Sequence, residues 1–320
     1  MRILSGIQPS GTLHLGNYFG MMKPCLDYQA GAEKFLFIAD YHALTTVRDA
    51  AALRANVRNV ALDFLACGLD PEKTVFYRQS DVPEVQELTW LLSVVTPMGL
   101  LERCHSYKDK LAKGIPASHA LFAYPVLMSA DILGVRSDAV PVGKDQKQHV
   151  EVARDIAIKF NNTFGEVFKV PEPVIGESVA VVPGLDGQKM SKSYHNTIDL
   201  FGDLKEMKKR IMRIVTDSKT VEDPKDPAAC NLFALYRLLA TDGERDALAA
   251  RYRAGGLGYG EVKKMLLEKI SSCFEPFRRR REELARDPGR VEGILRSGAA
   301  RARAEMNKTL RKARQAMGLE

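Results

Sequence analysis

Short apolar runs alternate with amphipathic segments through the first half of this 320-residue chain. The apolar runs, which predict buried strands, lie at residues 2–5, 34–39 and 74–77. The amphipathic segments between them, at 14–29 and 49–67, predict helices. Pro24 predicts a bend in the first helix, while Asp49 and Gly68 are typical residues for the beginning and end of the second. Because strands and helices alternate, we expect a parallel sheet with right-handed crossovers and a ligand above the carboxyl ends of its strands.

The pattern changes further along the chain. Residues 82–133 are mostly helical in character, residues 138–143 return to a strand that leads into a helix ending near Asn161, and the chain from about residue 203 is helical again. We therefore predict an α/β fold, a Rossmann-like doubly wound parallel sheet with a C-terminal all-α domain. The expected domains are residues 1–200, with a helical insertion at about 82–135 that is a candidate dimer interface, and residues 201–320.

The stretch from Ile3 to Asn17 contains a short strand, a turn of Gly, Pro and Ser, and the start of a helix entered through Thr12 and His14. The first turn of such a helix presents unpaired N–H groups and a partial positive charge, which suit a phosphate. Three glycines, at positions 6, 11 and 16, would let that anion approach the backbone. An ordinary strand-to-helix connection with a buried histidine is the alternative interpretation.

A second stretch, Lys189-Met190-Ser191-Lys192-Ser193, follows the apolar segment 179–182 and a turn at 183–187. Two lysines three positions apart in such a loop can both reach one polyphosphate. Taken alone, a short basic loop is more often solvated surface.

Composition and charge narrow the class of protein. A chain of this length with 45% hydrophobic residues can bury a full core, and it has no apolar run of 18 residues and no leader pattern, so we expect a soluble cytoplasmic protein without a membrane segment. Residues 201–320 hold 27 Lys and Arg against 18 Asp and Glu, a net charge of +9, while residues 1–200 have a net charge of −2. A basic surface of this kind favours a nucleic acid as partner, although a solvated helical domain explains the charge equally well.

Cysteines and histidines give no sign of a metal site. The five cysteines are odd in number and widely spread, which argues for reduced thiols and against both a disulfide framework and a zinc site. Four histidines, His42, His105, His119 and His149, lack a partner at ligand spacing, so we interpret them as structural or pocket-lining.

Together, the turn at residues 12–17 and the loop at 189–193 resemble the paired signatures of the class I aminoacyl-tRNA synthetases. The segments 5–11, 124–133 and 140–149 narrow the resemblance to the tryptophanyl-tRNA synthetase family, over nearly the whole chain. The related tyrosyl enzymes have a tyrosine in the first strand and an Asp-Pro turn after it, whereas this chain has Leu4 and Gln8. Leu4 would leave a phenol oxygen without a partner, and indole has only one donor.

The resemblance implies a pocket for tryptophan. Asp131 would accept a hydrogen bond from the indole N–H, and Gln8 would lie near the carboxylate of the amino acid. The ring would be walled by Leu4, Met128, Val140 and Val142, and the α-amino group would be held by Tyr124 and Gln146. A helix-surface carboxylate is the alternative for Asp131, and plain core packing is the alternative for Met128 and the valines.

The resemblance also implies an ATP site. The residues that would seat the triphosphate and ribose are Gln8, Pro9, Ser10, Thr12, His14, Gly16 and Asn17. Those that would contact the nucleoside are Gly143, Lys144, Asp145, Val181 and Val182, although Lys144 stands where many relatives carry glutamate, so only its backbone is expected to take part. The loop residues Lys189, Met190, Ser191, Lys192 and Ser193 would follow the pyrophosphate. Catalytic roles would fall to Gln8, Thr12, Lys110, Lys189 and Lys192, with Mg²⁺ bound through the phosphates of ATP.

The partners implied are tRNA(Trp), L-tryptophan, ATP and a second copy of the chain. Candidate phosphate contacts are Lys208, Lys209, Arg210, Arg213 and the arginines at 278–281. Some members of this branch bind an iron–sulfur cluster through four cysteines, but here only Cys230 matches the first of them, so no cluster is expected. Two other functions stay open, a nucleotidyltransferase that uses ATP without RNA and a non-catalytic RNA-binding relative.

Overall fold

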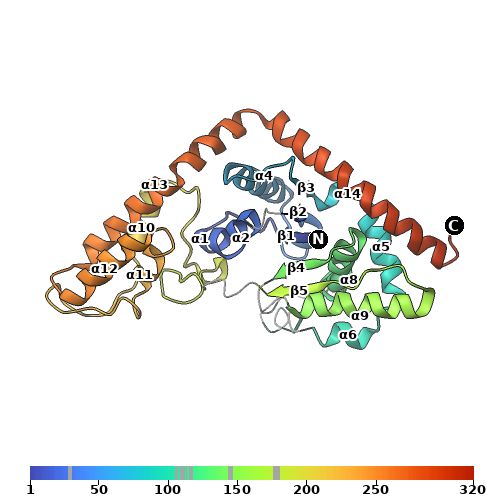
Figure 1. Ribbon diagram of the computed structural model, residues 1–320, viewed down its shortest axis with the longest axis horizontal. Helices are drawn as coiled ribbons and strands as arrows, with labels where there is room; N and C mark the ends of the chain where they lie inside the picture. The colour runs from blue at the N-terminus through green and yellow to red at the C-terminus, as the bar shows by residue number, and fades with distance from the viewer. Residues whose placement is uncertain are drawn as a thin grey trace.

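A parallel sheet forms the centre of the computed structural model, which describes residues 1–27, 31–104, 107–108, 112, 114, 118–142, 147–175 and 181–320 (Figure 1). Its described strands are β1 (Arg2–Ile7), β2 (Glu33–Ile38), β3 (Thr74–Arg78), β4 (Ala139–Val142) and β5 (Glu172–Ile175). They lie in the order β3-β2-β1-β4-β5, and each neighbouring pair is parallel. The chain therefore builds outward from β1 in both directions, which confirms the predicted doubly wound sheet and puts the point where the strand order reverses between β1 and β4, where this fold class binds its ligands.

Helices cover both faces of this sheet. Those of the first half of the chain are α1 (Leu15–Asn17), α2 (Lys23–Asp27), α3 (Asp40–Ala43), α4 (Ala50–Ala66), α5 (Glu84–Ser93), α6 (Met98–Glu102), α8 (His119–Gly134) and α9 (Lys147–Phe164). On one face Leu36 and Phe76 share a core with α4, and on the other Phe35 and Val75 share a core with α5 and α8. Neighbouring residues of one strand thus enter opposite cores, because successive side chains of a strand point to opposite faces.

The predicted helix boundaries agree with the residues that were expected to set them. The Asp49 carboxylate accepts a hydrogen bond from the Ala52 N–H at 2.8 Å, and Gly68 follows α4 with a φ of +106°. The first helix departs from α geometry in a wide π turn at Tyr18–Met22, directly before α2. Pro24 has no N–H to donate, so a wider turn in front of it loses little hydrogen bonding.

The sequence pattern did not predict one strand of the sheet, β5. Val181 and Val182, which were expected to contact the nucleoside, do not lie in a strand. Val182 instead accepts a hydrogen bond from the Met190 N–H at 2.8 Å, as part of a bridge with the loop that follows. Strand β5 contains Pro173 and lies at the edge of the described sheet, where a residue without an N–H is tolerated.

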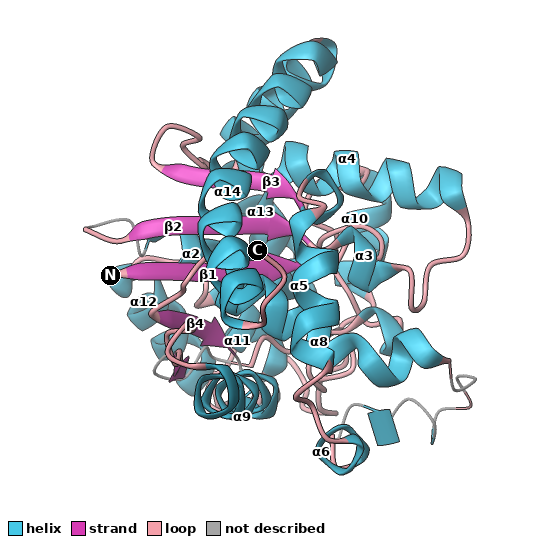
Figure 2. Cartoon of the chain, turned by 90° about the vertical axis from the view of Figure 1, so that its right-hand side faces the viewer, coloured by secondary structure: helices cyan, strands magenta, loops and turns pink. Residues whose placement is uncertain are grey.

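The last part of the chain is helical as predicted, with α10 (Leu204–Met212), α11 (Asn231–Tyr236), α12 (Asp242–Ala254), α13 (Tyr259–Arg286) and α14 (Pro288–Ala316). However, α14 returns to the sheet and crosses β3, as Figure 2 shows. Its Gly298 lies so close to β3 that an added Cβ would be 1.9 Å from the Phe76 oxygen. The helices that stand apart from the sheet are therefore α10, α11, α12 and the beginning of α13, which we call the helical unit (Figure 1).

Several arginines that were candidates for tRNA phosphates hold the fold together instead. Arg281 on α13 pairs with buried Asp63 on α4 at 2.6 Å, and Arg278 donates to the backbone oxygens of Gly202 and Leu200. Arg210 donates to the Thr197 oxygen at 2.9 Å. These three side chains, Arg210 on α10 and Arg278 and Arg281 on α13, are therefore committed to oxygens of the folded chain.

Within the described ranges, no helix is both long enough and apolar enough to cross a membrane. All five cysteines are described and are free thiols.

Candidate active site

The turn after β1 and the lysine loop, far apart in the sequence, lie against each other. The backbone segment that follows the loop pairs with the turn: the Leu15 N–H donates to the Ile198 oxygen, and the Leu200 N–H donates to the Leu13 oxygen, both at 2.9 Å. A further bond joins the loop itself to the turn, because the Gly16 N–H lies 3.3 Å from the Met190 sulfur. Met190 is 4% exposed, so its side chain fixes the loop to the core under the turn.

Lys192 reaches from the loop over the glycine turn. An added Cβ at Gly11 would lie 3.6 Å from the Lys192 Nζ, and Gly11 has a φ of +120°, which any other residue would adopt only with strain. Burial lowers the pKa of Lys192, and the charges of Asp199 and Asp63 oppose that shift. In the described part of the chain this ammonium group has no ion-pair partner, so it remains available for an anion above the turn.

His14, at the start of α1, lies next to this ammonium group. Burial first, and the Lys192 charge second, lower the pKa of His14 to about 4, so the imidazole is neutral at pH 7. Its Nδ1 has no hydrogen-bond partner among the described residues, and an added Cβ at Gly16 would come within 2.9 Å of it. A buried nitrogen without a partner is costly unless a ligand completes it. The glycine turn, Lys192 and His14 together therefore fit the phosphates of a nucleotide.

The loop is shaped by Asn196, a residue that the sequence analysis did not select. It is 2% exposed. Its Oδ1 accepts from the Ser191 N–H at 2.8 Å, and its Nδ2 donates to the Asp186 carboxylate and to the Lys189 oxygen. An asparagine after a loop is an ordinary turn residue in sequence, and nothing in the pattern indicates that its amide joins both sides of the loop.

Other loop and turn residues remain at the surface. The side chains of Lys189 and Ser193 in the loop are exposed, as are Gln8, Ser10 and Thr12 in the turn, while Pro9 is buried. Asn17 accepts from the His14 N–H at 3.1 Å and so closes the first turn of α1. Val181 is 66% exposed and Val182 is 5% exposed, so only one of the two valines is part of the core.

Asp131, on α8, is buried and not a surface carboxylate. Asp131 is 2% exposed. Its Oδ2 lies 2.9 Å from the His42 Nε2. The Gln79 Nε2 donates to both carboxylate oxygens, at 2.9 and 2.8 Å. Burial raises the pKa of Asp131, and the hydrogen bond from His42 opposes that rise. His42 and Gln79 follow β2 and β3, so two neighbouring strand ends orient this carboxylate.

The remaining residues of the expected tryptophan pocket surround α8 and the sheet. Leu4 and Val140 are buried in β1 and β4. Met128 is half-buried, and the Tyr124 hydroxyl lies 2.7 Å from the His149 Nε2. The other expected site residues, Lys110, Gly143, Lys144, Asp145, Gln146 and the side chain of Val142, lie outside the described part of the chain.

A doubly wound parallel sheet, a histidine turn at the carboxyl end of its first strand and a lysine loop folded onto that turn are typical of class I aminoacyl-tRNA synthetases. Residues 1–275 match the family described as tRNA synthetases class I (W and Y). The chain belongs to this family, and within it to the tryptophanyl-tRNA synthetases.

Individual relatives cover the whole chain. The chain is 56% identical over 319 residues to a tryptophan–tRNA ligase of Rhodopirellula baltica, with 100% of each chain covered. It is similar to a solved tryptophanyl-tRNA synthetase of Campylobacter jejuni in complex with ADP and tryptophan, with 52% identity, 100% coverage of both chains and a TM-score of 0.95. A tryptophanyl-tRNA synthetase structure from Mycoplasma pneumoniae matches with 30% identity, a TM-score of 0.83 and coverage of 100% of this chain and 98% of the other.

Proposed function

We propose that this chain ligates L-tryptophan to tRNA(Trp) at the expense of ATP, through a tryptophanyl-adenylate, and releases AMP and pyrophosphate. The observation that carries the proposal is the position of Lys192 above the glycine turn and beside His14, at the same sheet edge as the buried carboxylate of Asp131. The relative from Campylobacter jejuni with ADP and tryptophan supports the choice of substrates.

In the first step the tryptophan carboxylate attacks the α-phosphorus of ATP in line. An oxygen–phosphorus bond forms, the bond to the β-phosphate oxygen breaks, and pyrophosphate leaves. Because no proton has to move, the work of the protein is to position the substrates and to stabilise the charge that grows on the phosphates. We assign that role to Lys192 and Lys189, to the N–H groups of the turn and to Lys110.

Mg²⁺ is part of the proposal as an ion carried by the phosphates. No group of three or more His, Cys, Asp or Glu side chains in the described ranges is arranged to hold a metal ion. The ion supplies charge neutralisation on the leaving phosphates. We infer that no iron–sulfur cluster is bound, because residues 201–320 contain only Cys230 and Cys273 and a cluster needs four ligands.

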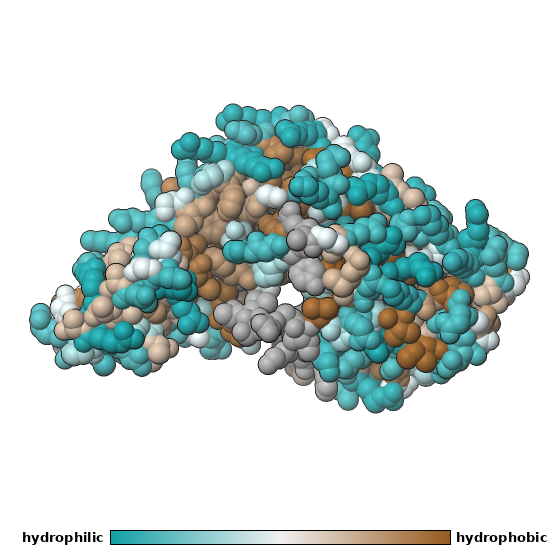
Figure 3. All heavy atoms as spheres, viewed as in Figure 1, coloured by the Kyte–Doolittle hydropathy of each residue, from teal (hydrophilic) through white to brown (hydrophobic). Residues whose placement is uncertain are grey.

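The second step takes place on tRNA, which we place on the helical unit. With Arg210, Arg278 and Arg281 committed inside the chain, the remaining candidates for phosphate contacts are exposed: Lys208, Lys209, Arg213, Arg279 and Arg280. Figure 3 shows hydrophilic side chains over the outer side of this unit and hydrophobic ones toward the hollow that faces the sheet. A cytoplasmic location belongs to the same proposal, since ATP and tRNA are both found there.

We propose a homodimer that forms through the surface of α5 and α6. Trp90, Val94 and Met98 recur at every fourth position and are 72%, 59% and 63% exposed. The buried side of the same helix, Leu88 and Leu91, packs into the core. A row of large apolar side chains on a folded surface, with a tryptophan among them, is typical of a protein interface.

Replacing Trp90 by glutamate is expected to convert the dimer to a monomer, because a charge would then be buried against the partner. Analytical ultracentrifugation at micromolar concentration measures the change. Since Trp90 is the only tryptophan of the chain, its fluorescence in the wild type should also shift to shorter wavelength as concentration increases. Val215→Glu, which places a charge at an exposed site shortly after α10, is the control and should leave the dimer intact. A monomeric wild-type protein would contradict the proposal.

Exchange of labelled pyrophosphate into ATP, measured with each amino acid and with and without tRNA, tests the function. We expect exchange that depends on tryptophan. Dependence on tyrosine would move the protein to the related family, exchange with neither amino acid but with another small acceptor would favour a nucleotidyltransferase, and tRNA binding without exchange would favour a non-catalytic relative.

A further inference from the structure

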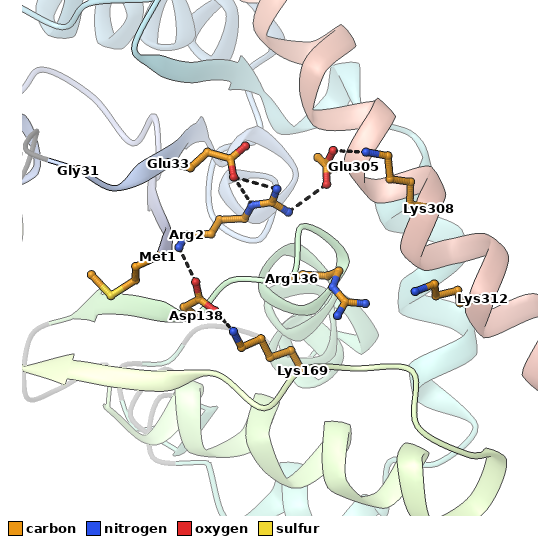
Figure 4. Close-up of a pocket in the computed structure, with 10 residues that line it drawn as sticks. All are labelled: Met1, Arg2, Gly31, Glu33, Arg136, Asp138, Lys169, Glu305, Lys308 and Lys312. Atoms are coloured by element: carbon orange, nitrogen blue, oxygen red, sulfur yellow. Dashed lines mark hydrogen bonds and ion pairs between the residues drawn. The ribbon is translucent and has the colours of Figure 1, made fainter.

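A cavity of about 690 Å³ opens at the amino-terminal edge of the sheet, away from the turn after β1 (Figure 4). Its walls are the first residues of β1 and β2, the end of α8 and one side of α14. The basic residues in these walls are Arg2, Arg136, Lys169, Lys308 and Lys312. We propose that this cavity binds a small phosphate-bearing anion, such as inorganic pyrophosphate or the phosphate chain of a nucleotide.

The acidic residues of the cavity are already neutralised. Glu33 and Glu305 both pair with Arg2, at 2.8 and 3.1 Å, and Glu305 also pairs with Lys308. Asp138 pairs with Lys169 and accepts a hydrogen bond from the Arg2 N–H. Each of these carboxylates is therefore held by a cation of the cavity, as the dashed lines in Figure 4 show.

Arg136 and Lys312 are different. In the described chain neither side chain has a hydrogen-bond or ion-pair partner, and Figure 4 shows them pointing toward one another from the end of α8 and from α14. Lys308 and Lys312 lie one turn apart on the side of α14 that carries Glu305. The two positive charges repel each other. An anion with two or more negative charges, bound between them, would attract both and offset that repulsion.

The backbone of Arg136 supports a role for its side chain. Arg136 follows the last turn of α8 with a φ of +55°, its N–H donates to the Leu133 oxygen, and the Ser137 N–H donates to the Ile132 oxygen. A helix end of this kind favours glycine. An arginine in this left-handed backbone conformation is strained. The strain indicates that Arg136 is placed there for its charged side chain and not for the turn.

The lining also limits the ligand. Among its described residues there is no aromatic ring on which a base could stack, so recognition would rest on charge. A volume of this size suits a ligand as large as a nucleotide, and the guanidinium group can bind two phosphate oxygens at once.

The test compares variants of the full-length protein in equilibrium dialysis against labelled pyrophosphate at low ionic strength. Arg136→Gly removes the charge and relieves the backbone, and Lys312→Ser removes the second cation. Arg311→Ser, which removes a cation from the next position of α14, is the matched control. The double variant R136G/K312S should bind one equivalent of pyrophosphate fewer per chain than the wild type. Each single variant should bind that pyrophosphate about 10- to 100-fold more weakly. R311S should bind as the wild type does.

The difference between variants, and not the total, is the measured quantity, so pyrophosphate bound at the proposed active site does not enter it. Thermal unfolding without anion should show R136G at least as stable as the wild type. Equal stoichiometry and affinity in all variants would overturn the proposal. So would a K312S variant that loses affinity for tRNA while it keeps all its pyrophosphate, since the cavity would then be an RNA contact.

Discussion

Lys192→Ala is expected to reduce the rate of tryptophan-dependent pyrophosphate exchange by about 10²- to 10³-fold, with the KM for tryptophan little changed. The Lys192 ammonium group lies above Gly11 without a partner in the described chain, so its charge is available to the phosphates as pyrophosphate leaves. Because this stabilisation develops in the transition state, its loss should appear in kcat.

Lys205→Ala, which removes an exposed lysine at the start of α10, serves as the control and should exchange at the wild-type rate. A second measurement tests the geometry. The Lys192 charge contributes to the lowered pKa of His14, so in Lys192→Ala the pKa of His14, followed by NMR, should rise while burial keeps it below 6.5. An unchanged rate together with an unchanged pKa would show that the loop does not act at this turn.

Asp131→Asn is expected to raise the KM for tryptophan by about 10- to 100-fold and to lower the free energy of unfolding by about 1.5–3 kcal/mol. The native carboxylate accepts hydrogen bonds from His42 and from Gln79 in a site from which water is excluded. An asparagine of the same shape offers one acceptor and one donor, so one N–H group would face another, and the indole N–H would lose a charged acceptor.

The two effects of this substitution can be measured separately. Steady-state exchange gives the KM, and urea unfolding gives the stability. Asp155→Asn, on the exposed side of α9, is the control and should change neither. If Asp131→Asn lost stability but kept its KM, the carboxylate would be a structural part of the core, and the indole would be recognised by another residue.

Much of the fold follows from local pattern. The apolar runs of β1, β2 and β3 and the caps of α4 were predicted, because burial and capping act over a few residues. The edge strand β5 was missed because a short run with Glu172 and Pro173 has too little apolar character to predict a strand. The return of α14 to β3 was missed for another reason: its small residues Gly298, Ala299 and Ala302 fit a close approach to β3, and their partner is more than 200 positions away.

The candidate site divides in the same way. The turn at Thr12–Asn17 and the loop at Lys189–Ser193 were found from residue types alone, since the chemistry of phosphate binding requires glycines, N–H groups and lysines. Asn196 and Gln79 were not assigned to the site, and His42 was interpreted only as structural or pocket-lining. Each acts through contacts with residues that the sequence does not place beside it. Arg278 and Arg281 were assigned to RNA because a run of arginines looks the same whether it faces solvent or Asp63.

The amino-acid sequence by itself therefore determined the first three strands, the α4 helix, the family and the two motifs proposed to bind phosphate, because these depend on residue types over short spans. Only the tertiary structure decided which cations are free. Arg136 and Lys312 point toward one another in the cavity of Figure 4, and Lys192 lies above Gly11, each without an ion-pair partner in the described chain. Arg210, Arg278 and Arg281, by contrast, are taken by oxygens of the chain itself. The physical reason is that the availability of a charge depends on what lies within a few ångströms of it, and folding brings those neighbours from distant parts of the chain.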